Sequence, residues 1–192
     1  VQGYADYAHF GWQRYRVSAP SEAFDAMVTT KYSQEKWSLE GRYRMHLRQQ
    51  DNSDKTRLVN RPEHQLRLTW SYTPLSKLTL RTQGNAISRT TELGNSKGVM
   101  LSEEATWKYR WLQINANVGW FHTDDNNSRI YLYEKSVLYD NTTSMYYGQG
   151  IRYALMARGE IGKRLTLSAK MGVTNYFDRT TISSGLQQVD AS

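Results

Sequence analysis

The sequence predicts an all-β fold, a transmembrane antiparallel up-and-down β-barrel that forms a single domain over residues 1–192. The first observation is a strict alternation in the segment 111–120, where apolar side chains share one side of an extended chain and polar side chains the other. The two sets are Leu112, Ile114, Ala116, Val118 and Trp120, and Gln113, Asn115, Asn117 and Gly119. An amide face this wide suits a water-filled lumen, so the apolar face is expected to contact lipid.

The composition is the second observation, because it excludes a membrane-spanning helix. Hydrophobic residues make up 39% of the chain, and no apolar run reaches the roughly 18 residues that a transmembrane helix requires. A transmembrane strand needs only about 9–11 residues of alternating pattern. The chain has no cysteine, which excludes a disulfide scaffold and thiolate metal sites. The net charge of +7 is compatible with nucleic acid, anionic lipid or acidic glycans as partners, and also with solubility alone.

Nine segments alternate well enough to cross a bilayer as strands. The first changes phase between Trp12 and Tyr15, which predicts a β-bulge. The sixth carries Glu103 on its apolar face, so either a bulge shifts the register or this carboxylate contacts another strand. The nine segments are residues 4–17, 23–32, 37–49, 65–73, 77–88, 98–109, 111–120, 151–159 and 165–173.

The lengths of the connections predict which end of the strands faces which side of the membrane. The long polar segments 50–62 and 90–98 belong to the extracellular end. Nine crossings leave the last strand at the cell surface, whereas bacterial barrels usually have an even number of strands and periplasmic termini. A tenth, closing strand is therefore expected after Ser192, and the chain is expected to be part of a longer protein. The short turns expected at the periplasmic end lie near residues 34–36, 74–76, 110 and 162–163.

The same parity constrains the long segment between the crossings 111–120 and 151–159. These two strands already supply the even number of crossings required between consecutive periplasmic turns. Residues 129–139 look like a strand but cannot be a third crossing. Residues 123–149 are therefore expected to form an extracellular excursion with a protruding hairpin.

Aromatic residues gather within a few residues of the short turns, which is the third observation. This arrangement is typical of the interfacial girdle of a membrane barrel. The alternative is a soluble β-barrel or sandwich whose apolar face is simply the core, because alternation alone does not define which face is inside. The girdle residues are Tyr32, Trp37, Trp70, Tyr72, Trp107, Tyr109 and Trp111.

The polar face collects ten basic residues that we expect to line the lumen. The same face carries three acidic residues, Asp25, Glu40 and Glu104. Such a wall favours anions, as rings of Arg and Lys do in anion pores, and it also suits a path for single-stranded nucleic acid. The alternative is that these cations pair with an inserted plug or loop and hold a narrow barrel rigid without transport. The ten residues are Lys31, Arg42, Arg44, Arg48, Arg67, Arg81, Lys108, Arg152, Arg158 and Lys170.

The sequence predicts no catalytic residue, cofactor or metal site. The best catalytic candidate is His122 beside Asp124 and Asp125, an acid–histidine arrangement similar to that of outer-membrane proteases. Residues 124–127 also offer hard oxygen ligands for Ca²⁺, but without a defined spacing, so a solvated loop is the simpler interpretation. The sequence contains no glycine-rich phosphate loop, metal-binding histidine pair or nucleophile elbow.

Three C-terminal segments carry a family resemblance: SRIYLYEKSVLY (128–139), MYYGQGIRYALMAR (145–158) and MGVTNYFDRTTISSGLQQVDAS (171–192). Over residues 60–192 the chain resembles the end of the barrel region of Bacteroidota-type outer-membrane proteins. Many of these are labelled helix-hairpin-helix proteins, because a competence-type DNA-binding domain precedes the barrel. In that family the barrel closes with a further strand that ends in an aromatic residue. The helix-hairpin-helix motif is absent here, so the resemblance implies fold and location and assigns no DNA-binding residue.

These observations predict a non-enzymatic β-barrel in the outer membrane of a Gram-negative bacterium. It is expected to act as a pore or membrane anchor for uptake of an anionic solute or polymer. A second hypothesis is a surface adhesion or docking barrel with a blocked lumen, in which residues 123–149 bind a protein partner. A third is an outer-rim hydrolase that depends on His122. Outer-membrane lipid is the expected partner, and the sequence leaves nucleic-acid binding and oligomeric state open.

Overall fold

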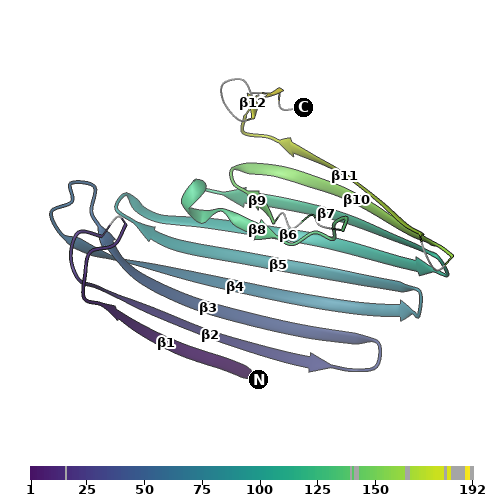
Figure 1. Ribbon diagram of the computed structural model, residues 1–192, viewed down its shortest axis with the longest axis horizontal. Helices are drawn as coiled ribbons and strands as arrows, with labels where there is room; N and C mark the ends of the chain where they lie inside the picture. Colours follow the sequence, from purple (N-terminus) through teal and green to yellow (C-terminus); the bar gives the residue numbers. More distant parts are fainter. Residues whose placement is uncertain are drawn as a thin grey trace.

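The computed structural model describes residues 1–15, 17–138, 140, 143–162, 165–179, 181–182 and 189–190. Nine antiparallel strands form one sheet in the order β1-β2-β3-β4-β5-β6-β7-β10-β11 (Figure 1). The strands of this sheet are β1 (Gln2–Phe10), β2 (Ser21–Ser33), β3 (Trp37–Asp51), β4 (Leu58–Leu75), β5 (Leu78–Thr91), β6 (Gly94–Tyr109), β7 (Leu112–Thr123), β10 (Gln149–Ile161) and β11 (Leu165–Tyr176). Within the sheet, strands adjacent in the chain are neighbours, apart from the excursion between β7 and β10.

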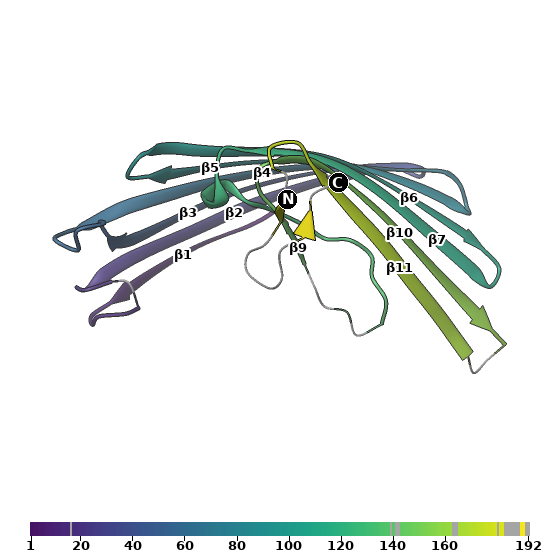
Figure 2. The same ribbon diagram turned by 90° about the horizontal axis from the view of Figure 1, so that it is seen from above.

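The predicted all-β class with nine antiparallel strands is confirmed. The sheet is strongly curved, and its concave side holds the excursion (Figure 2). Within the described residues β1 and β11 form the two edges of the sheet and do not pair with each other, so this part of the chain is not closed into a barrel. The predicted outer loop 178–192 falls largely outside the described residues. In its described part, β12 (Thr181–Ile182) pairs with β13 (Val189–Asp190).

The strand ends joined by the four predicted short turns all lie at one end of the sheet, and of the fourth turn the structure describes Gly162 (Figure 1). The turns join β2 to β3, β4 to β5, β6 to β7 and β10 to β11. Two of them include a left-handed backbone conformation, with φ of 47° at Arg110 and 64° at Gly162. Glycine adopts this conformation without steric cost, whereas Arg110 adopts it at some cost within a tight turn.

The strands extend further at the opposite end than the sequence predicted. Residues 90–98 are not a long loop, because β5 and β6 continue to a two-residue turn at Glu92 and Leu93. Hydroxyl groups tie the strand ends together: Thr91 Oγ1 donates to the Gly94 carbonyl at 2.8 Å. Similarly, the loop predicted over 50–62 is confined to the residues between β3 and β4.

The expected bulge in the first strand is wrong. β1 pairs with β2 in continuous register from Gln2 to Phe10, and the phase change seen in the sequence marks the end of the strand. Trp12 and Tyr15 lie beyond that end and are 80% and 87% exposed. For Glu103, the register is regular, and its carboxylate accepts a hydrogen bond from Thr82 Oγ1 on the adjacent strand at 2.6 Å. Contact with a neighbouring strand therefore accounts for Glu103.

The two faces of the sheet differ sharply in chemistry. On the convex face large apolar side chains are exposed, including Val118 at 45%, Leu155 at 52% and Leu167 at 56%. They do not meet in a dry centre, as a soluble sandwich requires. The concave face carries the polar and basic side chains. Along the middle of β6, buried residues of the concave face alternate with more exposed residues of the convex face.

The excursion between β7 and β10 folds inward over the concave face instead of protruding. It contains a 3-10 turn, η1 (Asn126–Ser128), and a short hairpin of β8 (Ile130–Leu132) and β9 (Ser144–Tyr146). The predicted hairpin is present, but its protruding orientation is wrong.

In the described part of the chain no helix is long and apolar enough to cross a membrane.

Packing explains the inward orientation of the excursion. Its apolar side chains form a buried cluster with residues of β6 and β7, and burial of such side chains is the main favourable term in folding. At Gly98 on β6 a Cβ atom would clash with the Ser128 carbonyl oxygen, so a glycine permits this close approach. The cluster consists of Met100, Phe121, Ile130, Leu132 and Tyr146.

Candidate functional site

The structure places all ten predicted lumen residues on the concave face. Directly paired residues of an antiparallel sheet share a face, and the register carries one parity from Lys31 on β2 to Lys170 on β11. Their assignment to a lumen stays a prediction. The ten are Lys31, Arg42, Arg44, Arg48, Arg67, Arg81, Lys108, Arg152, Arg158 and Lys170.

Two of these cations bind the excursion through Glu134, which the sequence analysis did not single out. Arg152 donates to both carboxylate oxygens, at 2.9 and 3.1 Å, and Lys170 Nζ lies 3.3 Å from Oε2. The Tyr146 hydroxyl donates a further hydrogen bond at 2.8 Å. The Glu134 side chain is only 2% exposed. A buried carboxylate is tolerated here because these donors replace its lost hydration.

The contacts of Glu134 keep it ionised despite its burial. Burial alone raises the pKa of Glu134, but the hydrogen bonds from Arg152 and Tyr146 and the charge of Arg152 outweigh this effect. The resulting pKa lies below the usual range of a glutamate. A second ion pair fixes the neighbouring residue, because Lys135 Nζ lies 2.7 Å from Glu104 Oε1. The excursion is thus held to the sheet by two charge contacts of opposite polarity.

Three other predicted lumen residues, Arg42, Arg44 and Arg158, pair with carboxylates of the sheet itself. Arg44 donates through Nε to Asp25 at 3.0 Å and makes a second contact with the same carboxylate. His46 Nδ1 lies 2.8 Å from Asp25 as well. Arg158 pairs with Glu160 at 3.0 Å near the short-turn end. These charges are compensated locally.

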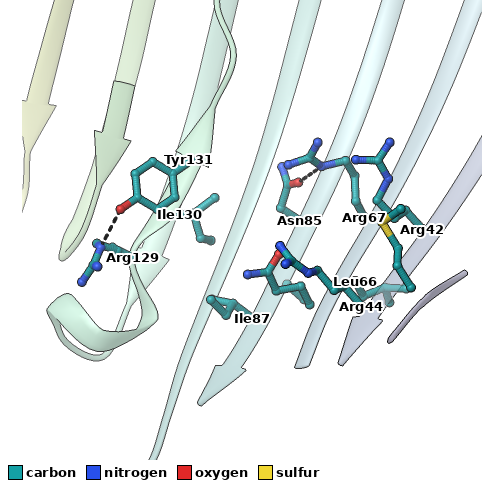
Figure 3. A pocket seen from close by; sticks show the side chains of 12 residues that line it. Arg42, Arg44, Leu66, Arg67, Asn85, Ile87, Arg129, Ile130 and Tyr131 are labelled. Carbon is teal, nitrogen blue, oxygen red and sulfur yellow. Dashed lines mark hydrogen bonds between the residues drawn. The ribbon is translucent and has the colours of Figure 1, made fainter. Parts of the chain in front are cut away.

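A basic groove lies between β3, β4 and β5 on one side and the excursion on the other (Figure 3). It comprises two adjoining cavities of about 220 Å³ and about 260 Å³. The two cavities share Arg44, Gln65, Ile87, Arg129 and Tyr131. We define the basic groove by its seven arginines, Arg42, Arg44, Arg48, Arg61, Arg67 and Arg89 of the sheet and Arg129 of the excursion.

The positive charge of the basic groove is only partly balanced. Arg67 Nε donates to Asn85 Oδ1 at 2.9 Å, and Arg129 Nε donates to the Tyr131 hydroxyl at 2.8 Å. Both partners are neutral. Within the described residues, carboxylates pair with four of the seven arginines, and none pairs with Arg48, Arg67 or Arg129. Planar guanidinium groups with free donors bind oxyanions well.

Three arginines of the basic groove were missed by sequence reasoning: Arg61, Arg89 and Arg129. Arg61 follows the alternation of β4, but Pro62 lacks an amide donor and argued against a strand there. Arg89 follows the alternation of β5 one residue beyond the predicted strand. Arg129 belongs to the excursion, and no pattern in the sequence shows that this segment turns inward.

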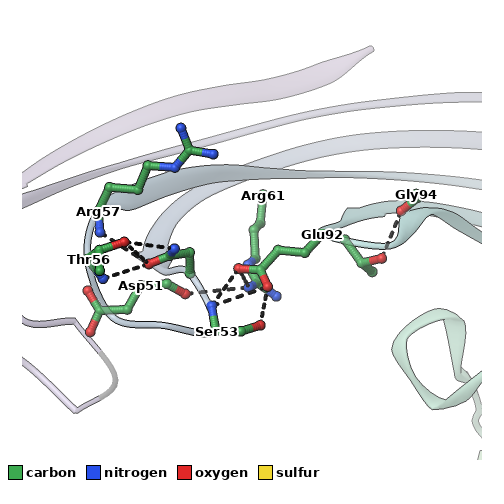
Figure 4. A network of polar contacts seen from close by, with 9 residues as sticks. Asp51, Ser53, Thr56, Arg57, Arg61, Glu92 and Gly94 are labelled. Carbon is green, nitrogen blue, oxygen red and sulfur yellow. Dashed lines mark hydrogen bonds and ion pairs between the residues drawn. The ribbon is translucent and has the colours of Figure 1, made fainter.

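A polar network fixes Arg61 at the long-loop end of the basic groove (Figure 4). Its guanidinium lies 3.0 Å from Glu92 Oε1, in the turn between β5 and β6. The backbone amide of Ser53, in the loop between β3 and β4, donates to the same carboxylate at 2.9 Å. The network links two connections that are far apart in the sequence and positions Arg61 on the concave side.

The predicted girdle residues lie near the short turns, and most are exposed on the convex face. Trp111, in the turn between β6 and β7, is 55% exposed. Flat aromatic surfaces at one rim suit an interface between lipid and water. The ring pairs, with their centroid separations, are Tyr32–Trp37 at 5.5 Å, Trp70–Tyr72 at 5.8 Å and Trp107–Tyr109 at 5.6 Å.

The catalytic candidate around His122 is not assembled. His122 points to the convex side and stacks on Trp120, with ring centroids 6.5 Å apart. Asp124 accepts the backbone amide of Lys97 at 2.9 Å, and Asp125 caps η1. The hydrogen bond from Ser96 Oγ to Asp125 is the main cause that lowers the pKa of this carboxyl. Among the described residues no group of three or more acidic, histidine or cysteine side chains is arranged to hold a metal ion.

Comparisons with known proteins return no match for this chain. No family model, no curated protein and no solved structure is similar to it. The relationship to barrels of the helix-hairpin-helix-labelled group therefore stays a prediction.

We expect Glu134→Gln to release the excursion from the sheet. The substitution leaves Arg152 and Lys170 partly buried without their shared counter-charge, which costs about 3 kcal/mol. Amide hydrogen exchange in β8 and β9 should then become roughly 100-fold faster. The control is Glu160→Gln, because Glu160 pairs with the exposed Arg158. In this variant amide exchange in β8 and β9 should change little. Equal protection in the two variants contradicts the anchoring role of Glu134.

The same contact makes a pH-dependent contribution to stability. Because the pKa of Glu134 is lower in the folded than in the unfolded state, its stabilisation is complete above the unfolded-state value and is lost as the pH falls through the folded-state value. The difference in exchange between wild type and Glu134→Gln should be full at neutral pH and shrink below about pH 4. A constant difference down to acidic pH is incompatible with an ionised Glu134.

Proposed function

We propose that the chain forms most of a β-barrel in the outer membrane of a Gram-negative bacterium, with its convex face in lipid and its concave face lining a basic lumen. The protein is a non-enzymatic pore or membrane anchor that serves uptake of an anionic solute or polymer. The observation that carries this proposal is the exposure of large apolar side chains over the convex face, opposite a face rich in arginine.

The convex face fits lipid better than water. Exposed apolar side chains extend from Val28 on β2, through Leu68 and Leu101, to Met171 on β11. Soluble monomers rarely expose contiguous apolar patches larger than a few hundred Å². A bilayer removes this cost, and strands whose backbone groups are paired within a sheet satisfy the demand for internal hydrogen bonds in lipid. The girdle residues at the short-turn rim support the same orientation.

The direction of the edge strands supports an even-stranded barrel. β1 and β11 both run from the short-turn end to the opposite end, so they are parallel to each other. Antiparallel closure therefore requires an odd number of further strands between the two edges. One such strand gives ten, which agrees with the even number of bacterial barrels. Closure also removes the edges, which lipid does not tolerate.

A second candidate function is a docking barrel whose lumen is blocked. The inward-folded excursion favours it, because the excursion covers the concave face over β6, β7 and β10. In that case the outer loops bind a protein partner and no solute passes. The basic groove argues for the pore, because three of its arginines have no carboxylate partner among the described residues.

Lipid contact is testable by fluorescence quenching in vesicles whose acyl chains carry bromine. In single-tryptophan variants of the full-length protein, with the remaining tryptophans replaced by Phe, we expect Trp107 emission to fall by about half, since its ring lies in the interfacial region. The control keeps only Trp12, which lies outside the strands and is 80% exposed, and its emission should be unchanged. Equal quenching of both, or of neither, contradicts the membrane orientation.

Planar-bilayer conductance separates the pore from the docking barrel. With the full-length protein we expect channels in which chloride is more permeant than potassium, because arginine-lined walls attract anions. A cation preference contradicts the basic lumen. Insertion without conductance supports the docking barrel instead.

A further inference from the structure

Two pairs of arginines face each other directly across β3 and β4. Arg42 lies opposite Arg67, and Arg48 lies opposite Arg61. Like charges at directly opposite positions destabilise a sheet. One member of each pair has a carboxylate partner, at 3.8 Å for Arg42 and 3.0 Å for Arg61. Among the described residues Arg67 and Arg48 have none, so each pair keeps one uncompensated positive charge.

The same part of the basic groove is short of hydrogen-bond acceptors. Among the described residues, the buried donors Arg42 Nε, Arg61 Nε and Asn85 Nδ2 have no hydrogen-bond partner. Buried donors in folded proteins almost always have one. Repelling cations and unused donors at the same positions are relieved together by an oxyanion, which supplies both negative charge and acceptor atoms.

The spacing of the two pairs defines the size of the ligand. Arg42 and Arg48 are six residues apart on one strand, which corresponds to roughly 20 Å. A single small anion cannot contact both pairs, whereas a polymer that lies along the strands can. The cations of the basic groove are all arginines, and their planar forks suit repeated carboxylate groups.

We propose that the basic groove binds a linear acidic polysaccharide that runs along β3 and β4, with carboxylate groups at the two arginine pairs. This inference rests on the proposed function, because it requires the basic groove to face a space that the polymer can enter. Single-stranded nucleic acid fits less well, since its binding sites stack bases on several aromatic rings. The described lining of the two cavities has two aromatic rings, Tyr131, whose hydroxyl is engaged by Arg129, and His46, whose Nδ1 contacts Asp25.

The test uses the full-length protein in detergent micelles and fluorescein-labelled polygalacturonate, followed by fluorescence anisotropy. We expect saturable binding that weakens as salt is raised, because charge-assisted contacts dominate. Uncharged dextran should not bind. Digalacturonate should bind at least about tenfold more weakly than the polymer, because it is too short to reach both arginine pairs. Equal affinity for the dimer overturns the extended mode, and tighter binding of an oligothymidylate overturns the assignment to a polysaccharide.

Matched substitutions locate the site. Arg48→Gln and Arg67→Gln should each weaken polygalacturonate binding by about tenfold, since each removes one charge-assisted contact. The control is Arg158→Gln, which removes the same charge from the same face outside the basic groove, and its affinity should stay within about twofold. Equal effects of all three substitutions indicate attraction by net charge alone and overturn the proposal. Circular dichroism of each variant verifies that the β-structure is retained.

The failure of this inference is distinguishable from the failure of the proposed function. If bromolipids quench Trp107 but polygalacturonate does not bind, the polysaccharide assignment is wrong and the membrane barrel stands. If polygalacturonate binds with the expected substitution pattern but no lipid quenching occurs, the basic groove is a polysaccharide site on a protein that is not embedded in lipid.

Discussion

The structure depends on a two-residue alternation that is held in register across nine paired strands, and the register shift between Tyr72 and Leu75 lies at the end of β4, beside the turn to β5. A slip of one residue in any strand moves its whole set of side chains to the opposite face. The ladder keeps Lys31 on the second strand and Lys170 on the ninth on the same side of the sheet. Segregation of apolar and basic side chains is therefore a property of the sheet as a whole and not of any single strand.

This segregation leaves the concave face with more cations than its own carboxylates neutralise. The excursion neutralises some of these cations. Glu134 enters from the excursion to compensate Arg152 and Lys170, and Lys135 compensates Glu104 in return. These ion pairs allow charged side chains of the excursion and the sheet to be buried together without an isolated charge. No equivalent carboxylate reaches Arg67 or Arg48 within the described residues. The concave face is thus divided into a neutralised region under the excursion and a basic groove beside it.

Much of the sheet was predictable because the alternation is a local signal. The segment 111–120 and the short turns identify strand, face and direction without knowledge of partners, and the parity argument correctly excluded residues 129–139 as a crossing. Strand ends were less predictable. Because of Pro62, the first residues of β4 were predicted as part of a loop. The phase change after Phe10 resembled a bulge, although the strand ends there.

The site was only partly predictable, because its decisive contacts join segments distant in sequence. The ten predicted basic residues share a face, but nothing local distinguishes Arg152, which is neutralised, from Arg67, which is not. That distinction depends on where Glu134 lies, and so on the inward fold of the excursion. Burial of Ile130 and Leu132 against Phe121 determines that fold, and a sequence pattern of this length does not identify its packing partner.

The central claim is that the two faces of each strand lie in different solvents. The chain contains no cysteine, so single cysteines introduced in turn over residues 39–47 of β3 can each carry a nitroxide spin label in lipid vesicles. The account predicts that odd-numbered positions are accessible to oxygen, which partitions into lipid, and even-numbered positions to a water-soluble nickel chelate, with a period of two residues. Equal access of the nickel chelate to both sets of positions contradicts it.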